Sequence, residues 1–91
     1  MICYVYVLRS DKDGNKYIGI TDNIKRRVTQ HKKGIVTSTR NRRPLRLVYI
    51  EKYLDRISAR KRERYFKTAA GRRFLKELKT AEMVELADTH V

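Results

Sequence analysis

Two short runs near the start of the chain alternate aromatic and β-branched residues in the way that strands do. Residues 3–8 read Cys-Tyr-Val-Tyr-Val-Leu and residues 16–20 read Lys-Tyr-Ile-Gly-Ile, each bounded by polar residues. The segment between them contains an Asp-Gly pair at 13–14, which is typical of a reversal between antiparallel strands. The pattern predicts a β-hairpin in which Tyr4 and Tyr6 share one face, because alternate side chains of a strand point the same way.

Helical spacing follows the hairpin. Ile24 and Val28 lie four residues apart and predict a helix with a narrow apolar stripe. The polar residues 21–23 offer N-cap side chains. We expect this helix to end near Lys33, because Gly34 follows it.

The middle of the chain changes from a loop to a third strand. Residues 34–44 combine Gly, Thr, Ser, Asn and Pro with three arginines, a loop composition with cations available for phosphate groups. Residues 45–50, Leu-Arg-Leu-Val-Tyr-Ile, predict a strand that runs on towards Tyr53.

Two more helices are predicted after this strand. Asp55 is a suitable N-cap for a helix over residues 56–70, which Gly71 is expected to close. The apolar contacts of the last helix are expected from Phe74, Leu75 and Leu78.

The order β-β-α-β-α-α predicts a small α+β domain with a three-stranded antiparallel sheet flanked by helices. Ninety-one residues suffice for one domain with one modest core. We expect that domain to span residues 1–79. Residues 80–91 are expected to be an acidic C-terminal tail that either extends the last helix or frays.

The charge of the chain is strongly one-sided. The 23 Lys and Arg residues against 10 Asp and Glu give a formal net charge of +13, and every Lys and Arg lies at or before position 79. Such a field attracts polyanions, and nucleic acid is the usual target. Solubility or an acidic protein partner are the alternative explanations of the charge.

The sequence also disfavours several classes of protein. The lone cysteine, Cys3, excludes an internal disulfide framework and a multi-cysteine zinc site, and it suits a reducing compartment. The first apolar run is too short for a signal peptide or a membrane span, so we expect a cytoplasmic protein. Glycine-rich nucleotide loops, Ser-His-Asp triads and heptad-based basic zippers find no match.

One acid occupies an unusual position. Glu63 lies in the middle of the most apolar stripe of the second predicted helix, with Ala59, Phe66 and Ala70. The simplest interpretation is an i,i+4 ion pair with Lys67. A carboxylate on an apolar stripe must be desolvated, however, and needs a cation or a metal ion there. Both interpretations stay open.

Four further residues are candidates for a site. Arg27 and His31 are four apart at the edge of the buried face of the first helix, overlooking the hairpin. Taken singly, Arg27 is most simply a phosphate contact and His31 a helix-edge residue. Tyr6 and Tyr17 are most simply core aromatics with hydroxyls that reach solvent, and Gly19 leaves a gap beside Tyr17 for a close approach. The interpretation as core aromatics also applies to Tyr4, Tyr49 and Tyr53.

Together these residues resemble the GIY-YIG nucleases. Residues 4–6, a ten-residue gap and residues 17–19 resemble the paired motif of that family. The loop 39–44 leading into 47–49 is similar to its small single-domain bacterial branch, and the resemblance covers residues 2–75. Arg27, His31 and Glu63 stand where the family pattern has its arginine, its histidine and its metal-binding glutamate.

The resemblance implies a metal-dependent DNA endonuclease that hydrolyses phosphodiester bonds, with structured DNA in repair or recombination as its expected substrate. Glu63 would hold Mg²⁺ or Mn²⁺, since magnesium needs only one or two carboxylates beside waters and substrate oxygens. Tyr6 or Tyr17 would deprotonate the attacking water, because nearby cations favour the phenolate. Arg27 would stabilise the pentavalent phosphate, and His31 would position these groups or relay a proton.

Tyr6 is the favoured base, because it shares a strand face with Tyr4.

The alternative function is a non-catalytic module that keeps the nuclease fold and binds structured DNA, RNA or a ribosome. The absence of any asparagine after Asn41 favours this alternative, since several family nucleases have a late asparagine. The oligomeric state stays open, with a protein partner as one source of specificity. Nucleic-acid contacts are expected from Lys25, Arg26, Arg40, Arg42, Arg43 and Lys67.

Overall fold

A computed structural model describes residues 2–78 of the chain. The strands form one antiparallel sheet in the order β2-β1-β3, so β1 is central. This confirms the predicted α+β fold with its three-stranded sheet. The predicted acidic tail, 80–91, lies outside the described residues. The elements are β1 (Cys3–Ser10), β2 (Lys16–Thr21), α1 (Ile24–Lys32), a 3₁₀ turn (Arg40–Arg42), β3 (Leu45–Tyr53), α2 (Arg56–Phe66) and α3 (Ala69–Glu77).

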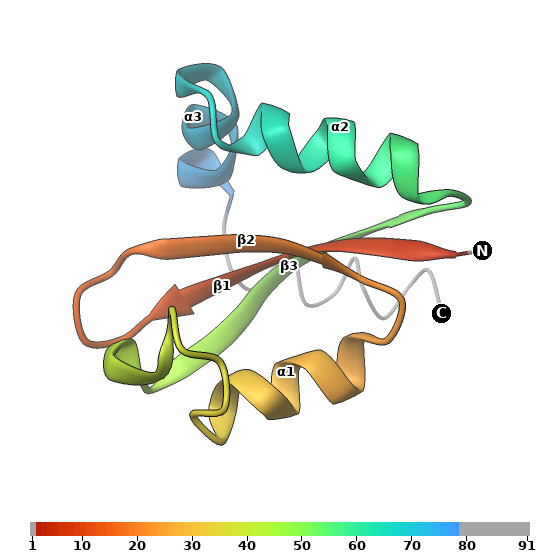
Figure 1. Cartoon of the computed structure of the whole chain (residues 1–91). Helices are drawn as coiled ribbons and strands as arrows, with labels where there is room; N and C mark the ends of the chain where they lie inside the picture. Colours follow the sequence, from red (N-terminus) through yellow and green to blue (C-terminus); the bar gives the residue numbers. More distant parts are fainter. Residues whose placement is uncertain (1, 79–91) are drawn as a thin grey trace.

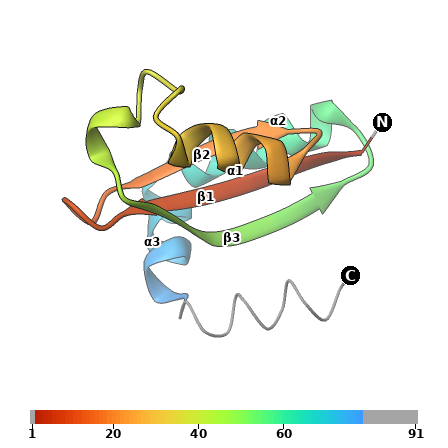
Figure 2. The same ribbon diagram turned by 90° about the horizontal axis from the view of Figure 1, so that it is seen from below.

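Helices cover both faces of the sheet. Helix α1 lies on one face, and α2 and α3 lie on the other (Figures 1 and 2). The alternation of β1 therefore fills two separate hydrophobic clusters, and the predicted division of its faces is confirmed. Cys3, Val5 and Val7 pack with Phe66 and Leu75 on the α2–α3 face. Tyr6 and Leu8 pack with Leu45, Ile24 and Val28 on the α1 face.

A β-bulge in β3 lets both clusters draw on this strand. Val7 of β1 is opposite Tyr49, but Leu8 is opposite Leu47, so Val48 is an extra residue in the ladder. As a result Val48 and Tyr49 are both buried on the α2–α3 face, whereas Leu47 joins the α1 face. The bulge thus resets the alternation halfway along the strand.

The starts of α1 and α2 are capped as the sequence predicts, but the predicted end of α2 is wrong. Asp55 caps α2 through a hydrogen bond from the Ser58 backbone N–H at 2.7 Å. That helix ends at Phe66 instead of Gly71, because Thr68 caps a new helix and accepts from the Gly71 N–H.

Gly71 lies buried inside α3, where a Cβ would collide with the backbone carbonyl of Tyr65. This glycine therefore permits close packing of α3 on the end of α2, and it does not terminate a helix. Ala70, expected on the stripe of Glu63, belongs to α3 and is exposed.

A polar network that the sequence does not reveal joins α2 to β3. The hydroxyls of Tyr49 and Tyr53 donate hydrogen bonds to Glu51, and Arg62 of α2 donates to both carboxylate oxygens at 2.9 and 3.1 Å. The Arg62 guanidinium also lies over the Phe66 ring, 4.6 Å from its centroid. The expectation that the hydroxyls of Tyr49 and Tyr53 reach solvent is therefore wrong. Both serve a partly buried ion pair instead.

The network also shifts acid–base equilibria. Burial raises the pKa of Glu51, but the hydrogen bonds from Arg62, Tyr49 and Tyr53 outweigh it and leave that pKa below its ordinary value. Burial and the hydrogen bond to Glu51 raise the pKa of Tyr53 to about 12. The carboxylate therefore stays ionised and the phenols stay neutral around pH 7.

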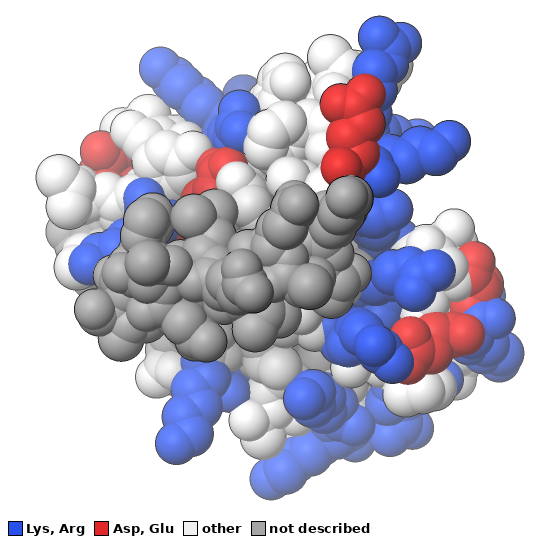
Figure 3. Space-filling view, turned by 180° about the vertical axis from the view of Figure 1, so that it is seen from behind, with Lys and Arg blue, Asp and Glu red and all other residues white. Residues whose placement is uncertain are grey.

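The surface seen from behind is rich in Lys and Arg (Figure 3). On the face seen from behind, Lys and Arg side chains project around the margin, and Asp and Glu form a few small groups beside them (Figure 3). Several exposed acids form ion pairs with arginines, such as Asp22 with Arg26 and Asp13 with Arg42. Within residues 2–78, no helix is both long and apolar enough to cross a membrane.

Candidate active site

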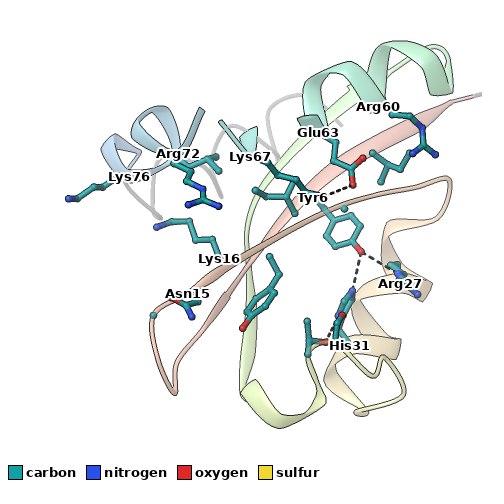
Figure 4. A pocket seen from close by; sticks show the side chains of 18 residues that line it. Tyr6, Asn15, Lys16, Arg27, His31, Arg60, Glu63, Lys67, Arg72 and Lys76 are labelled. Carbon is teal, nitrogen blue, oxygen red and sulfur yellow. Dashed lines mark hydrogen bonds and ion pairs between the residues drawn. The ribbon is translucent and has the colours of Figure 1, made fainter. Parts of the chain in front are cut away.

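A cleft of about 1040 Å³ runs along the outer edge of β2. Because β2 is an edge strand, the cleft reaches both faces of the sheet, with α1 on one side and α2 and α3 on the other (Figure 4). In the part of the chain that the structure describes, its polar lining contains one carboxylate among many cations. The residues predicted to be catalytic all contribute to this lining: Tyr6, Tyr17, Arg27, His31 and Glu63.

The Tyr6 hydroxyl is held by two residues of α1. It lies 3.0 Å from Nε2 of His31, and it accepts a hydrogen bond from Nε of Arg27 at 3.2 Å. Arg27 and His31 are one helical turn apart, so both reach the same phenol from one helix face. The polar neighbours of Tyr6 are therefore these two residues. One lone pair of the phenol oxygen stays available to a further donor.

His31 is buried and links Tyr6 to the loop before the 3₁₀ turn. Its side chain is 4% exposed, and its Nδ1 lies 2.7 Å from Oγ1 of Thr39, which is also buried. Burial, and next the charge of Arg27, hold the pKa of His31 below its ordinary value. A neutral imidazole between two hydroxyls donates at one nitrogen and accepts at the other. His31 can therefore accept a hydrogen bond from the Tyr6 hydroxyl at Nε2 while Thr39 holds the opposite nitrogen.

Gly19 lets the Tyr6 ring reach this position. The two residues are directly opposite in the β1–β2 ladder, and a Cβ at Gly19 would lie 2.5 Å from the Tyr6 oxygen. The sequence predicts that Gly19 leaves a gap beside Tyr17, which a backbone segment or a ligand could enter. Instead it is occupied by the ring of Tyr6, which is 3% exposed.

Glu63 reaches the cleft from α2, on the other side of β2. Its side chain is 16% exposed, and it forms the expected i,i+4 ion pair with Lys67 at 3.4 Å. It also lines the same cleft as Tyr6 and Tyr17. The two interpretations of this acid are therefore compatible in the structure.

The donor set around Glu63 limits the kind of metal site. No group of three or more His, Cys, Asp or Glu residues within residues 2–78 could hold a metal ion. Among residues 2–78, Glu63 is the only carboxylate in the cleft lining, so it offers hard oxygen ligands from one residue. Magnesium binds in this way when waters and substrate phosphates complete its shell. The residues fit a metal ion shared with a substrate and do not fit an all-protein cage.

The predicted nucleic-acid contacts are mostly outside the cleft. Lys67 lines it, whereas the other five do not. Arg26 pairs with Asp22, Arg42 with Asp13, and Arg43 donates to the Arg40 carbonyl. The residues outside the lining are Lys25, Arg26, Arg40, Arg42 and Arg43.

Several cleft residues were missed by the sequence analysis. Thr39 had no visible signal beyond its loop composition. Arg60 precedes Glu63 by one helical turn, a spacing that would have placed both on one face. Three further cations enter the lining because of how α3 packs against β2, which no local sequence pattern defines. They are Lys16, Arg72 and Lys76.

Comparison with known proteins identifies the class to which this fold and cleft belong. The family model described as the GIY-YIG catalytic domain matches residues 2–77. The chain therefore belongs to the GIY-YIG family, which confirms the resemblance seen in the sequence.

Its relatives are UPF0213 proteins. One from Desulfotalea psychrophila is 47% identical over 62 residues, which cover 66% of this chain and 56% of that protein. One from Clostridium perfringens is 40% identical over 65 residues, covering 70% and 69%. The alignments to the Desulfotalea protein and to one from Lactiplantibacillus plantarum span less than two thirds of those relatives. The solution NMR structure of a UPF0213 protein from Bacillus halodurans matches with a TM-score of 0.55 and 32% identity, covering 88% of this chain and 87% of that one.

Proposed function

We propose that this protein is a metal-dependent endonuclease that hydrolyses phosphodiester bonds in DNA. The observation that carries the proposal is the Tyr6 hydroxyl held between His31 and Arg27, in the same cleft as a single carboxylate. Phosphodiester hydrolysis needs a base for the attacking water and cations around the phosphate. Membership of a family described as a catalytic domain supports the same function.

Tyr6 is the base in this mechanism, and His31 receives its proton. His31 is neutral because its pKa is lowered, so its Nε2 can take the phenol proton while Thr39 holds Nδ1, and the low pKa makes it release that proton to solvent again. The phenol oxygen takes a proton from water, the water oxygen attacks phosphorus as the P–O bond to the leaving oxygen breaks, and the leaving oxygen takes a proton from solvent water. Tyr17 is a weaker candidate, because its hydroxyl has no hydrogen-bond partner among residues 2–78 that would accept its proton.

Arg27 has two tasks in the same site. Its Nε–H donates to the Tyr6 hydroxyl and holds the phenol in place, and one terminal nitrogen donates to the side-chain oxygen of Gln30 at 3.2 Å. The other terminal amine has no partner within the described part of the chain. We assign it to the phosphate oxygens, whose negative charge grows in the transition state.

Glu63 is the residue that would hold a divalent ion, Mg²⁺ or Mn²⁺. Such an ion, when bound, supplies Lewis-acid stabilisation of the phosphoryl and leaving oxygens. Lys67 must give up its ion pair with Glu63 or share the carboxylate, which has two oxygens. The substrate that we propose is structured DNA of the kind met in repair or recombination, in the cytoplasm.

The test is cleavage of nicked, flapped, branched and plain duplex DNA with Mg²⁺ or Mn²⁺ and then with EDTA. Cleavage should require the metal, and Tyr6→Phe and Glu63→Gln should each lower kcat by about 10²–10⁴. Tyr4→Phe and Glu77→Gln are matched controls, since neither residue lines the cleft, and both should keep wild-type rates. The proposal fails if no substrate is cut or if Glu63→Gln cuts as well as wild type.

Binding without cleavage is the second candidate function, and the ion pair of Glu63 with Lys67 favours it. A carboxylate among cations would then only balance charge. In this case Glu63→Gln leaves DNA affinity unchanged or raises it, because a negative charge near the phosphates is lost. Tyr6→Phe would leave affinity unchanged, and no metal-dependent product would form.

A further inference from the structure

Two like-charged residues are directly opposite each other at the start of β2. Arg9 of β1 and Lys16 of β2 are partners in the antiparallel ladder. Lys16 has the same strand parity as Ile18 and Ile20, which pack on the α2–α3 face. Its side chain therefore lies on the α3 side of the sheet, opposite to that of Tyr17, which packs with the α1 cluster.

Helix α3 adds two more cations at this place. Arg72 and Lys76 are four residues apart on one face of α3, and both line the cleft. In Figure 4 they lie together with Lys16 on the side of β2 away from Arg27 and His31. A smaller hollow of about 240 Å³ adjoins the cleft there, and Lys16 and Lys76 line both.

This arrangement has a cost in the free protein. Like charges directly opposite in a sheet, or four apart on a helix, are destabilising. Within residues 2–78, none of these four side chains forms an ion pair or a hydrogen bond with a protein group. Among the described residues, the lining of the hollow that Arg9, Lys16 and Lys76 share contains no acid. Four unpaired cations from three elements therefore concentrate positive charge where no acid of the described protein balances it.

We propose that Arg9, Lys16, Arg72 and Lys76 form a second phosphate site, which binds the DNA backbone beside the scissile phosphate. The proposal rests on the proposed function for the identity of the ligand. The cleft is continuous from Tyr6 along the edge of β2 to Arg72 and Lys76. A DNA strand cut near Tyr6 and Glu63 therefore continues along this edge, and its flanking phosphates meet the four cations. Lysine and arginine side chains are the usual contacts to such phosphates.

The experiment compares two double variants that each remove two positive charges. Lys16→Gln/Lys76→Gln removes cations of the proposed site. Lys52→Gln/Lys61→Gln is the matched control, because both of its lysines are exposed and neither lines the cleft. Binding of a fluorescein-labelled duplex is measured by anisotropy between 50 and 200 mM NaCl, with EDTA present to prevent cleavage.

The site variant should lower the steepness of log Kd against log salt by about 1.8, since each lost phosphate contact removes about 0.9. At 0.1 M salt this corresponds to about 60-fold weaker binding, if the affinities converge at 1 M. The control should keep a slope near that of wild type. Equal changes in the two variants would overturn the proposal, because they would show only a general charge effect.

Thermal unfolding without DNA tests whether the variant still folds, and it does not depend on cleavage. Without DNA, the site variant should unfold at a temperature equal to or above that of wild type, because it loses like-charge repulsion. A lower unfolding temperature would contradict the assigned repulsion.

The two proposals can fail separately. If no DNA is cut but the site variant alone shows the lower salt slope, the phosphate site stands and the nuclease function fails. If Tyr6→Phe abolishes cleavage and the slopes do not differ, the nuclease stands and this site fails.

Discussion

The ring of Tyr6 lies across the backbone of Gly19, on the neighbouring strand. A side chain at Gly19 would begin 2.5 Å from the phenol oxygen and 2.6 Å from the ring carbon that carries it. The phenol can therefore reach His31 and Arg27 only because the facing residue has no Cβ. Tyr6, from the first half of the family motif, and Gly19, from the second half, therefore depend on each other sterically in this chain.

Gly19→Ala should displace the Tyr6 ring and reduce cleavage. We expect a loss of about 1–3 kcal/mol in unfolding free energy from the overpacking, and a lower kcat because the Tyr6 contacts to His31 and Arg27 are broken. Urea unfolding and single-turnover cleavage measure the two effects. In a Tyr6→Leu background the alanine should be tolerated better, so additive losses in the double variant would refute the steric link.

Arg27→Ala separates a catalytic role from simple binding. If the arginine stabilises charge on the phosphate, kcat should fall by about 10²–10³, while DNA affinity changes by less than about fivefold. Arg26→Ala is the control, since the neighbouring arginine is exposed and paired with Asp22. A large loss of affinity with little change in kcat would make Arg27 a positioning contact instead.

His31 should make stability depend on mild acid. Its folded pKa is below the ordinary 6.5, so the unfolded chain binds more protons than the folded one as the pH falls below 6.5. Unfolding free energy should therefore fall as the pH is lowered through 6.5, and His31 should account for part of that fall. His31→Gln should lose that part of the pH dependence in urea titrations. An unchanged pH profile in the variant would show that His31 is not held neutral.

Glu51→Gln should destabilise the fold without touching the cleft. It leaves Arg62 without its ion-pair partner, and we expect a loss of about 2 kcal/mol. Because the folded pKa of Glu51 is lowered, this stabilisation is present above the unfolded pKa near 4.5 and is lost as the pH falls through the folded pKa. Asp22→Asn, which breaks an exposed pair, should cost less than about 1 kcal/mol. Thermal unfolding of the two variants at pH 7 makes the comparison.

Much of the fold follows from local signals. The hairpin, the strand at Leu45–Tyr53 and the cap at Asp55 come from strand alternation and N-cap chemistry. Those signals act over a few residues, so one sequence suffices to detect them. The same is true of Arg27 and His31, which a single helical turn brings to one phenol.

Other features depend on contacts between distant segments. The role of Gly71 follows from the approach of α3 to the end of α2, and the bulge at Val48 follows from packing against both layers. The pairing of Glu51 with Arg62 needs β3 and α2 to be docked first. Likewise, Lys16 and Lys76 are brought to one cleft by the placement of α3, which no local pattern encodes.

The position of the cleft restricts how this protein can assemble. Its chemistry occupies both sides of the outer edge of β2, and this strand has no neighbour on that side within residues 2–78. A second chain that extended the sheet by strand addition at β2 would fill the cleft and exclude DNA. A dimer that extends the sheet and still binds DNA would therefore have to pair through β3. Its two clefts would then face outward at opposite ends of a continuous six-stranded sheet.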